Sequence, residues 1–219
     1  MQIFKQHRAF FVLYFVFLLI SAYVMVVYSK SSIHIYFNQF HNIFSDTFFK
    51  YLTHLGDGIT VVLIGLAFLL FNSKRAGLLI WLTGILNGLI SQGMKHWIFG
   101  EAPRPYKYFT EVYPTVLHYV EGVDLNSLNS LPSGHTSASF ALYLSIAMIY
   151  QNRRVDNIMF LMAFGIGISR IYLSQHFLED VFMGSIIGVL SAIVIYSWLY
   201  SPDQLEKPNL SSPLIKKLF

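Results

Sequence analysis

The chain has 219 residues, of which 55% are hydrophobic and only 12% are charged, whereas a soluble domain carries about 25% charged residues. This deficit excludes an ordinary soluble domain and indicates a protein that lies mostly in lipid. The absence of cysteine excludes disulfides, thiolate metal sites and cysteine nucleophiles. The net charge of +4 includes no long basic run, so nucleic acid is set aside as a partner.

Six apolar segments are predicted to cross a membrane as helices, because lipid offers no water to satisfy the polar groups of any other backbone. The first segment follows Lys5 and Arg8, as a signal peptide would follow its basic start. Its length and the lack of a small-residue cleavage site favour a retained anchor. The segments are residues 9–28, 59–72, 76–99, 136–150, 158–173 and 181–200.

Aromatic and aliphatic residues recur at three- and four-residue spacing between the first two segments. This spacing predicts an amphipathic helix that lies in the membrane interface, and a stripe packed against the bundle is the alternative. The residues are Phe37, Phe40, Phe44, Phe48, Tyr51, Leu52 and Leu55.

Gly184 and Gly188 in the last segment form a G-x-x-x-G pair, which favours close helix packing inside the bundle. The sequence therefore predicts an all-α fold, a polytopic membrane helical bundle with six transmembrane helices plus an interfacial amphipathic helix. A single membrane-embedded domain is expected over residues 1–219, with a cytoplasmic tail at 201–219.

Basic residues gather in loops that an even number of spans places on one side of the membrane. The positive-inside rule makes that side cytoplasmic, so both termini are expected there and residues 100–135 and 173–180 outside. The expected location is a bacterial-type inner (plasma) membrane, with the site facing the periplasm or outside. The basic residues are Lys5, Arg8, Lys74, Arg75, Arg153, Arg154, Lys207, Lys216 and Lys217.

The outside loops hold ionisable residues at helix ends, where a charge near lipid usually marks function. His176 and Asp180 are four residues apart and would share one face of a helix. The carboxylate could then fix the tautomer of the imidazole and leave its other nitrogen free to attack. His135 follows a Ser-Gly turn at a predicted helix start, where free backbone N–H groups bind anions.

Cationic side chains occupy the same predicted loops. Arg104 and Arg170 offer planar forks that match phosphate oxygens, and Lys95 adds a point charge. A second histidine near a phosphate held in this way could protonate a leaving oxygen. Together these residue types indicate phosphoryl transfer, which chiefly needs positioning and neutralised oxygens.

Three motifs carry these residues. Residues 169–180 read SRIYLSQHFLED and fit the pattern SR-x5-H-x3-D, and residues 132–135 read PSGH. Lys95 and Arg104 fit the pattern K-x6-RP except that eight residues separate them, and Lys107 is a weaker substitute for the lysine. At these motifs the chain resembles the type 2 phosphatidic acid phosphatase superfamily, in its membrane-bound lipid phosphatase branch, between residues 55 and 200.

The resemblance implies a role for each motif residue. His176 would be the nucleophile that forms a phosphohistidine, Asp180 would orient it, and His135 would act as general acid and then as general base. The resemblance also implies that the reaction needs no metal and no cofactor. The residues expected to bind the substrate phosphate are Lys95, Arg104, Ser133, Gly134 and Arg170.

The substrate expected from the resemblance is a phosphorylated membrane lipid: undecaprenyl pyrophosphate, phosphatidylglycerophosphate, phosphatidic acid or lipid A phosphate. The segment 106–131 is long and aromatic, which suggests a lid that selects head groups. The alternative functions are a membrane transporter and a non-catalytic phospholipid-binding protein. A transporter would place polar residues near the middle of its spans, whereas here they cluster at one set of helix ends.

The remaining histidines have no such neighbours in the sequence and are interpreted as interfacial or loop residues. Asp57 is interpreted as a turn and helix-capping residue and is left out of the predicted site. The histidines are His7, His34, His41, His54, His96 and His118.

Overall fold

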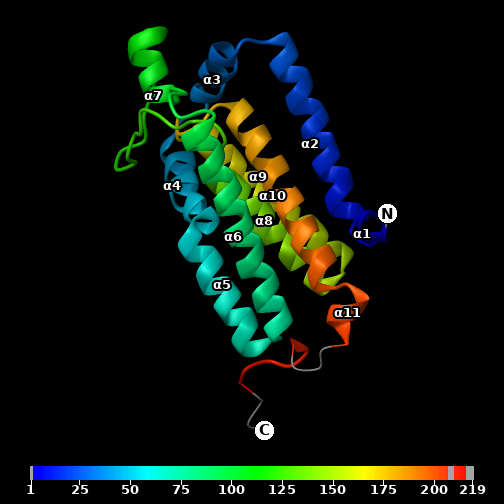
Figure 1. Ribbon diagram of the computed structural model, residues 1–219. Coiled ribbons are helices and arrows are strands. Elements are labelled where there is room, and N and C mark those ends of the chain that lie inside the picture. Colours follow the sequence, from blue (N-terminus) through cyan, green and yellow to red (C-terminus); the bar gives the residue numbers. More distant parts are fainter. Residues whose placement is uncertain (1, 207–209, 216–219) are drawn as a thin grey trace.

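The computed structural model describes residues 2–206 and 210–215, so Lys207, Lys216 and Lys217 lie outside the described residues. All regular elements in the described ranges are helices, which confirms the all-α prediction. Figure 1 shows the long helices side by side in one bundle. The elements are α1 (Gln2–Gln6), α2 (Arg8–Val27), α3 (Lys30–Asn38), α4 (Ile43–Leu52), η1 (Thr53–Gly56), α5 (Gly58–Phe71), α6 (Lys74–Trp97), α7 (Pro105–Lys107), η2 (Tyr108–Val112), α8 (Gly134–Tyr150), α9 (Arg153–Tyr172), α10 (Leu178–Leu199) and α11 (Pro202–Leu205).

Each of the six predicted segments corresponds to one long helix: α2, α5, α6, α8, α9 and α10. Among the described residues, α2, α6, α9 and α10 are long and apolar enough to span a membrane, and α4 to η1 with α5, bent by 57°, is a possible fifth span. With 17 residues α8 is only about 26 Å long, slightly less than a hydrocarbon core. The polytopic membrane bundle is therefore confirmed, and the count of six crossings stays a prediction.

The aromatic stripe is divided between two helices. Gln39 ends α3, and Asn42 starts α4 by accepting a hydrogen bond from the backbone N–H of Ser45. Much of the stripe is exposed, including Phe44 and Tyr51, as a helix in contact with lipid requires. The prediction of a single interfacial helix was wrong in one respect: the stripe is not one continuous helix, because Asn42 caps the start of a new helix within it.

The central helix is α8, which packs against α6, α9 and α10. Residues 139–148 of this helix are all buried. By contrast, α2 and α5 expose large apolar side chains such as Leu19, Val26 and Ile59, as lipid-facing helices do. A Cβ on Gly184 would lie 2.7 Å from the backbone oxygen of Ser133, so the glycine pair of α10 packs inside the bundle as predicted.

The two ends of the bundle differ in their loops. One end carries α1, the turn between α5 and α6, and residues 210–215, which hydrogen-bond to that turn through the backbone oxygen of Ser212 and the N–H of Lys74. The other end, drawn at the top of Figure 1, carries α3, α7, the long loop before α8 and the turn between α9 and α10. All three sequence motifs reach this second end.

Candidate active site

The turn between α9 and α10 folds back so that His176 points into the bundle. The backbone N–H groups of Gln175 and His176 both donate to the carbonyl of Arg170, at 2.9 and 3.1 Å. Ser174 makes this tight turn possible with φ of 53°, in the left-handed region. His176 is therefore held by backbone contacts one residue before Phe177, the N-cap of α10.

Nδ1 of His176 lies 3.3 Å from Oδ2 of Asp180, which confirms the predicted contact. The geometry differs from the expectation, because His176 precedes the helix rather than sharing its face. The same carboxylate oxygen accepts hydrogen bonds from Ser130 Oγ at 2.5 Å and from the N–H of Phe177 at 2.9 Å. With Asp180 fixed in this way, Nδ1 of His176 donates and Nε2 is left as the free nitrogen.

Burial lowers the pKa of His176 well below its ordinary value, and the positive charges of Arg104, Arg170 and Lys95 lower it further. Only 2% of the His176 side chain is exposed. A neutral imidazole is the form that carries a nucleophilic lone pair. The environment therefore keeps His176 in its reactive state at neutral pH.

The second motif opens α8 as predicted. Ser133 is the N-cap, and its backbone N–H donates to the backbone oxygen of Asp180 at 3.0 Å, which ties the starts of α8 and α10 together. Its Oγ accepts a hydrogen bond from Thr136 Oγ1 at 2.8 Å and is fully buried. Thus Ser133 serves as a helix cap in this structure, while Gly134 and His135 line the adjacent cavity.

Arg104 reaches the site from the long loop. Its Nε donates to the backbone oxygen of Leu128 at 2.9 Å, whereas its terminal nitrogens make only long contacts of 3.4 to 3.5 Å with Gln175 and Asn129. A short bond thus fixes the guanidinium, and its two outer nitrogens stay available for an anion.

Arg170 shares Gln175 with Arg104: its NH2 contacts Gln175 Oε1 at 3.4 Å, and its NH1 donates to Thr53 Oγ1 at 2.6 Å. Its Nε is buried without a hydrogen-bond partner among the described residues. Buried donors without partners are costly, and a bound anion would satisfy this one.

Lys95 also reaches the site, despite its unusual spacing to Arg104. A Cβ placed on Gly134 would lie 3.8 Å from Nζ of Lys95. The two extra residues are taken up after α6 in a turn, where the N–H of Ala102 donates to the backbone oxygen of Phe99 at 3.0 Å. Lys107, the weaker candidate, instead pairs with Glu111 at 3.7 Å.

One cavity of about 690 Å³ is lined by six of the eight predicted residues, while Ser133 and Asp180 lie behind its wall. Its charged end is lined by Lys95, Arg104, Gly134, His135, Arg170 and His176. Apolar residues of α5 and α6 line much of the remainder, together with the polar residues Asn87, Ser91 and Gln92 of α6. Asp57 also lines this cavity, so its omission from the predicted site was a miss. Gln175 and Ser130 were missed as well, although they lie within or beside the motifs and hold Arg104 and Asp180.

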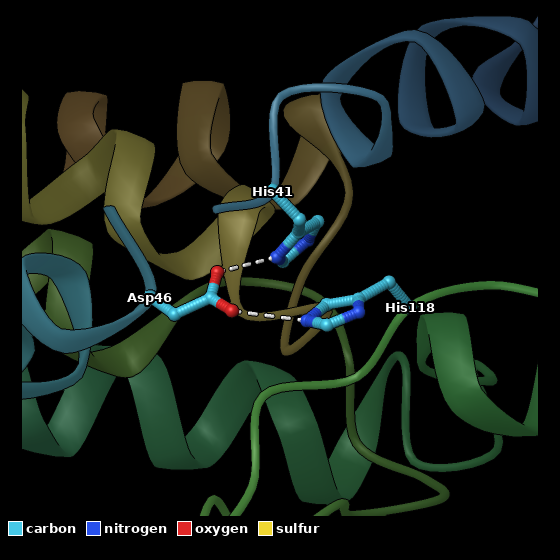
Figure 2. A group of neighbouring side chains, drawn as sticks. All are labelled: His41, Asp46 and His118. Carbon is cyan, nitrogen blue, oxygen red and sulfur yellow. Dashed lines mark hydrogen bonds and ion pairs between the residues drawn. The ribbon is translucent and has the colours of Figure 1, made fainter. Parts of the chain in front are cut away.

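Several of the other histidines, which were interpreted as interfacial or loop residues, have polar partners from distant parts of the chain. His7 pairs with Asp156 at 3.0 Å, and His34 contacts Ser174 at 3.1 Å. His41 and His118 both contact Asp46, as Figure 2 shows. Among the described residues these last three form the one group that could hold a metal ion, and none of them lines the cavity.

Comparison with known proteins gives matches of different extent. The undecaprenyl-diphosphatase BcrC of Bacillus subtilis (strain 168) is 28% identical over 159 residues, which are 71% of this chain and 76% of that protein. The bacitracin transport permease protein BcrC of Bacillus licheniformis is 35% identical over 68 residues, 31% of this chain and 32% of that protein. A putative phosphatidate phosphatase of Drosophila melanogaster is 36% identical over 36% of this chain and 24% of that protein. The chain thus matches a third or less of the length of the latter two proteins.

Two solved structures share the fold. The crystal structure of Aquifex aeolicus LpxE superposes with a TM-score of 0.66 at 24% identity, covering 76% of this chain and 93% of that one. A transmembrane PAP2 type phosphatidylglycerolphosphate phosphatase from Bacillus subtilis gives 0.62 at 23% identity, covering 91% and 98%. A family model described as the PAP2 superfamily matches residues 75–202, which include all three motifs. The match covers more than half of the sequence, so the chain belongs to the PAP2 superfamily, which includes phosphoric ester hydrolases.

Proposed function

We propose that this protein is an integral membrane phosphatase that removes a phosphate group from a lipid through a phosphohistidine on His176. The observation that carries the proposal is the cavity in which two histidines and three cationic side chains face one volume. A tetrahedral anion fits this arrangement, because guanidinium forks and an ammonium neutralise its oxygens while the imidazoles exchange protons.

In the first step Nε2 of His176 attacks phosphorus, and the bond from phosphorus to the bridging oxygen breaks. His135 gives its proton to that oxygen, so that a lipid alcohol, or a lipid monophosphate from a diphosphate, leaves. Asp180, 3.3 Å from Nδ1, stabilises the positive charge that His176 acquires. Lys95, Arg104 and Arg170 hold the non-bridging oxygens, together with the backbone at Gly134.

In the second step His135 takes a proton from a water molecule that attacks the phosphohistidine. The phosphorus–nitrogen bond breaks, inorganic phosphate leaves and His176 is regenerated as the neutral base. Asp57 lines the same cavity as His135 and is suited to orient its imidazole. None of these steps requires a metal ion, since protein cations supply the charge.

The cavity supports a lipid substrate. Val61 and Val62 of α5, with Trp81 and Ile85 of α6, line the part away from the charged end. An acyl or prenyl chain can lie against these residues while its phosphate reaches the histidines. The longest curated match is to an undecaprenyl-diphosphatase, which makes a prenyl diphosphate the first of the four candidate substrates.

The proposed location is a bacterial inner membrane, with the termini in the cytoplasm and the cavity opening toward the periplasm or outside. The basic residues Lys5, Arg8 and Lys74 lie at the end of the bundle opposite the site, which supports this orientation.

The decisive test is phosphate release by purified protein in detergent from the four candidate lipids, with EDTA present. We expect release from at least one lipid by the wild type and none by His176→Ala. Activity that chelation abolishes both in the wild type and in His118→Ala, a variant without the intact group of His41, Asp46 and His118, would contradict the metal-free mechanism. Lipid binding without any release would instead indicate the non-catalytic phospholipid-binding alternative.

The long loop provides a separate test of substrate choice. Its residues Asn129 and Leu128 hold Arg104 through their backbone oxygens, so the loop is part of the site. Exchanging residues 106–126 for a relative's loop, with the Arg104 contacts kept, should change the ranking of the four lipids. An unchanged ranking would show that the loop is not a selective lid.

A further inference from the structure

A cluster of imidazole and carboxylate groups lies outside the cavity, where three separate segments meet. Nδ1 of His41 lies 2.8 Å from Oδ1 of Asp46, and Nε2 of His118 lies 3.0 Å from Oδ2 of the same residue. His41 comes from the connection between α3 and α4, Asp46 from the first turn of α4, and His118 from the long loop. Figure 2 shows both rings directing a nitrogen at the one carboxylate.

The three side chains have the chemistry of a transition-metal site. We propose that His41, Asp46 and His118 bind one zinc ion, or a similar divalent first-row metal, at a site separate from the phosphate cavity. Two imidazoles with one carboxylate match the three protein ligands of many zinc sites, and they do not suit magnesium or calcium, which prefer oxygen.

The distances fit such an ion with little rearrangement. One ligand atom from each residue lies within 4.8 Å of the others. Tetrahedral zinc with bonds of about 2.1 Å needs ligand atoms roughly 3.4 Å apart, and this separation falls within the 4.8 Å spread of the cluster. Half of the His118 side chain is exposed, and this side leaves a fourth position open to water.

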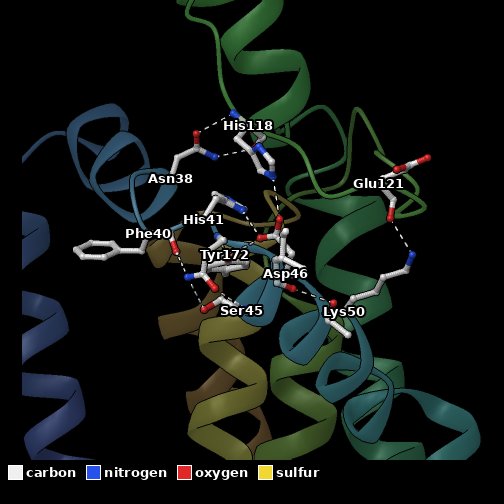
Figure 3. A network of polar contacts seen from close by, with 12 residues as sticks. Asn38, Phe40, His41, Ser45, Asp46, Lys50, His118, Glu121 and Tyr172 are labelled. Atoms are coloured by element: carbon white, nitrogen blue, oxygen red, sulfur yellow. Dashed lines mark hydrogen bonds and ion pairs between the residues drawn. The ribbon is translucent and has the colours of Figure 1, made fainter.

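Neighbouring residues hold the three ligands in place. Tyr172 donates a hydrogen bond to Oδ1 of Asp46 at 2.5 Å, and its ring packs against His41 with the centroids 4.1 Å apart. The side chain of Asn38 both accepts from and donates to the backbone of His118, at 2.9 and 2.8 Å. Figure 3 shows these contacts around the cluster. Ligands supported in this way keep the orientation that metal binding needs.

A metal ion at this site would hold the long loop against α4. The loop is already tied to α4 where Lys50 Nζ donates to the backbone oxygen of Glu121 at 2.7 Å. A metal ion between His118 and Asp46 adds a second and stronger link to the same helix. The loop continues to Leu128 and Asn129, which hold Arg104, so the ion would fix the segment that supports the phosphate site.

Metal content tests the proposal without any substrate. Untagged full-length protein is purified in detergent, equilibrated with zinc chloride, dialysed against metal-free buffer and measured by atomic emission. We expect about one zinc per chain in the wild type and in His96→Ala, whose histidine is exposed and outside the cluster. His118→Ala, at a half-exposed position that tolerates the change, should retain none.

Two further measurements keep the proposal falsifiable. Cobalt(II) in place of zinc should give the visible absorption of a four-coordinate ion with the wild type and lose it with His41→Ala. Tyr172→Phe should weaken zinc binding roughly tenfold, because it removes the short hydrogen bond to Asp46 and keeps the ring beside His41. Wild-type protein without bound zinc, or equal zinc in His118→Ala, would overturn the proposal. Loss of phosphate release in His176→Ala, which keeps all three zinc ligands, decides the proposed phosphatase function separately.

Discussion

Two buried histidine–aspartate pairs lie at opposite ends of α9. At its start, Nδ1 of His7 lies 3.0 Å from Oδ1 of Asp156, and just after its end Nδ1 of His176 lies 3.3 Å from Oδ2 of Asp180. All four side chains are at most 2% exposed. The two pairs have nearly the same internal chemistry, but only His176 lines a cavity.

The difference between the pairs lies in their surroundings. The free nitrogen of His7 is buried without a hydrogen-bond partner among the described residues, so it meets no substrate. His176 shares its cavity with Lys95, Arg104 and Arg170. A histidine–aspartate pair becomes a candidate nucleophile only where its second nitrogen faces an anion site. The first pair is suited to joining α2 to α9.

Replacing His176 should give the largest difference between the two histidine–aspartate pairs in their effect on turnover. His176→Ala removes the nucleophile, and turnover should fall by at least about 10⁴-fold, since losing a nucleophile disables the whole catalytic unit. The thermal midpoint in detergent should change little in comparison. Phosphate release and a melting curve on the same sample measure both quantities, and residual turnover near the wild-type rate would exclude His176 as the nucleophile.

His7→Ala should have the opposite pattern. It leaves the buried carboxylate of Asp156 without its partner, which typically costs about 3–5 kcal/mol and lowers the melting temperature on the order of 10 °C. Turnover of the remaining folded protein should stay within about twofold of wild type, since Asp156 lies about 21 Å along α9 from Arg170, the residue of that helix that lines the cavity. A large loss of turnover with an unchanged melting curve would mean that this end of the bundle takes part in catalysis.

The cations around His176 should not contribute equally. Arg104→Ala should lower turnover by about 10²–10³-fold, because a planar fork aimed at phosphate oxygens is lost. Lys95→Ala removes a point charge on a flexible stem and should cost about tenfold. Steady-state rates of the two variants decide the order, and a greater loss for Lys95→Ala would reverse the assignment within the first motif.

The buried, neutral histidine His34 of α3 should make the free energy of unfolding depend on pH. Burial, the largest cause, and the nearby His41 together lower the pKa of His34 to about 4, against a smaller opposite effect of Asp180. Between pH 6.5 and 4 the unfolded chain binds a proton at this residue that the folded chain does not, so stability falls as the pH falls. The loss amounts to at most roughly 3 kcal/mol. His34→Phe should flatten the fall of the melting temperature across this range, and an unchanged slope would refute the assignment.

The helices and the motif residues could be predicted because their signals are local. The apolar length of each segment matched one helix. Ser133, an N-cap residue, and Asp180, an acidic residue in a first turn, indicated where α8 and α10 start. The spacing of His176 and Asp180 brought them into contact even though the turn geometry differed. The break at Asn42 could also have been predicted, because asparagine is a strong N-cap residue and Ser45, whose N–H it accepts from, lies three positions further along the chain.

The contacts between distant segments could not be predicted. His118 and Asp46 are 72 residues apart, and Tyr172 and Asp46 are 126 apart. No periodicity encodes how an irregular loop approaches two short helices, so these contacts depend on the folded backbone. For the same reason Asp57 was interpreted only as a helix cap. It does cap α5, but it also lines the cavity, which the sequence could not indicate.

Direct backbone contact between α8 and α10 sets the distance between the starts of these two helices. Gly184 and Gly188 leave no room for a methyl group against the carbonyls of Ser133 and Ser137. The reacting groups carried by these two helices thus keep their separation whatever side chains face the acyl or prenyl chain. Substitutions on the cavity walls of α5 and α6 could therefore change which lipid chain the proposed site accepts, while His135 and Asp180 keep their relative positions.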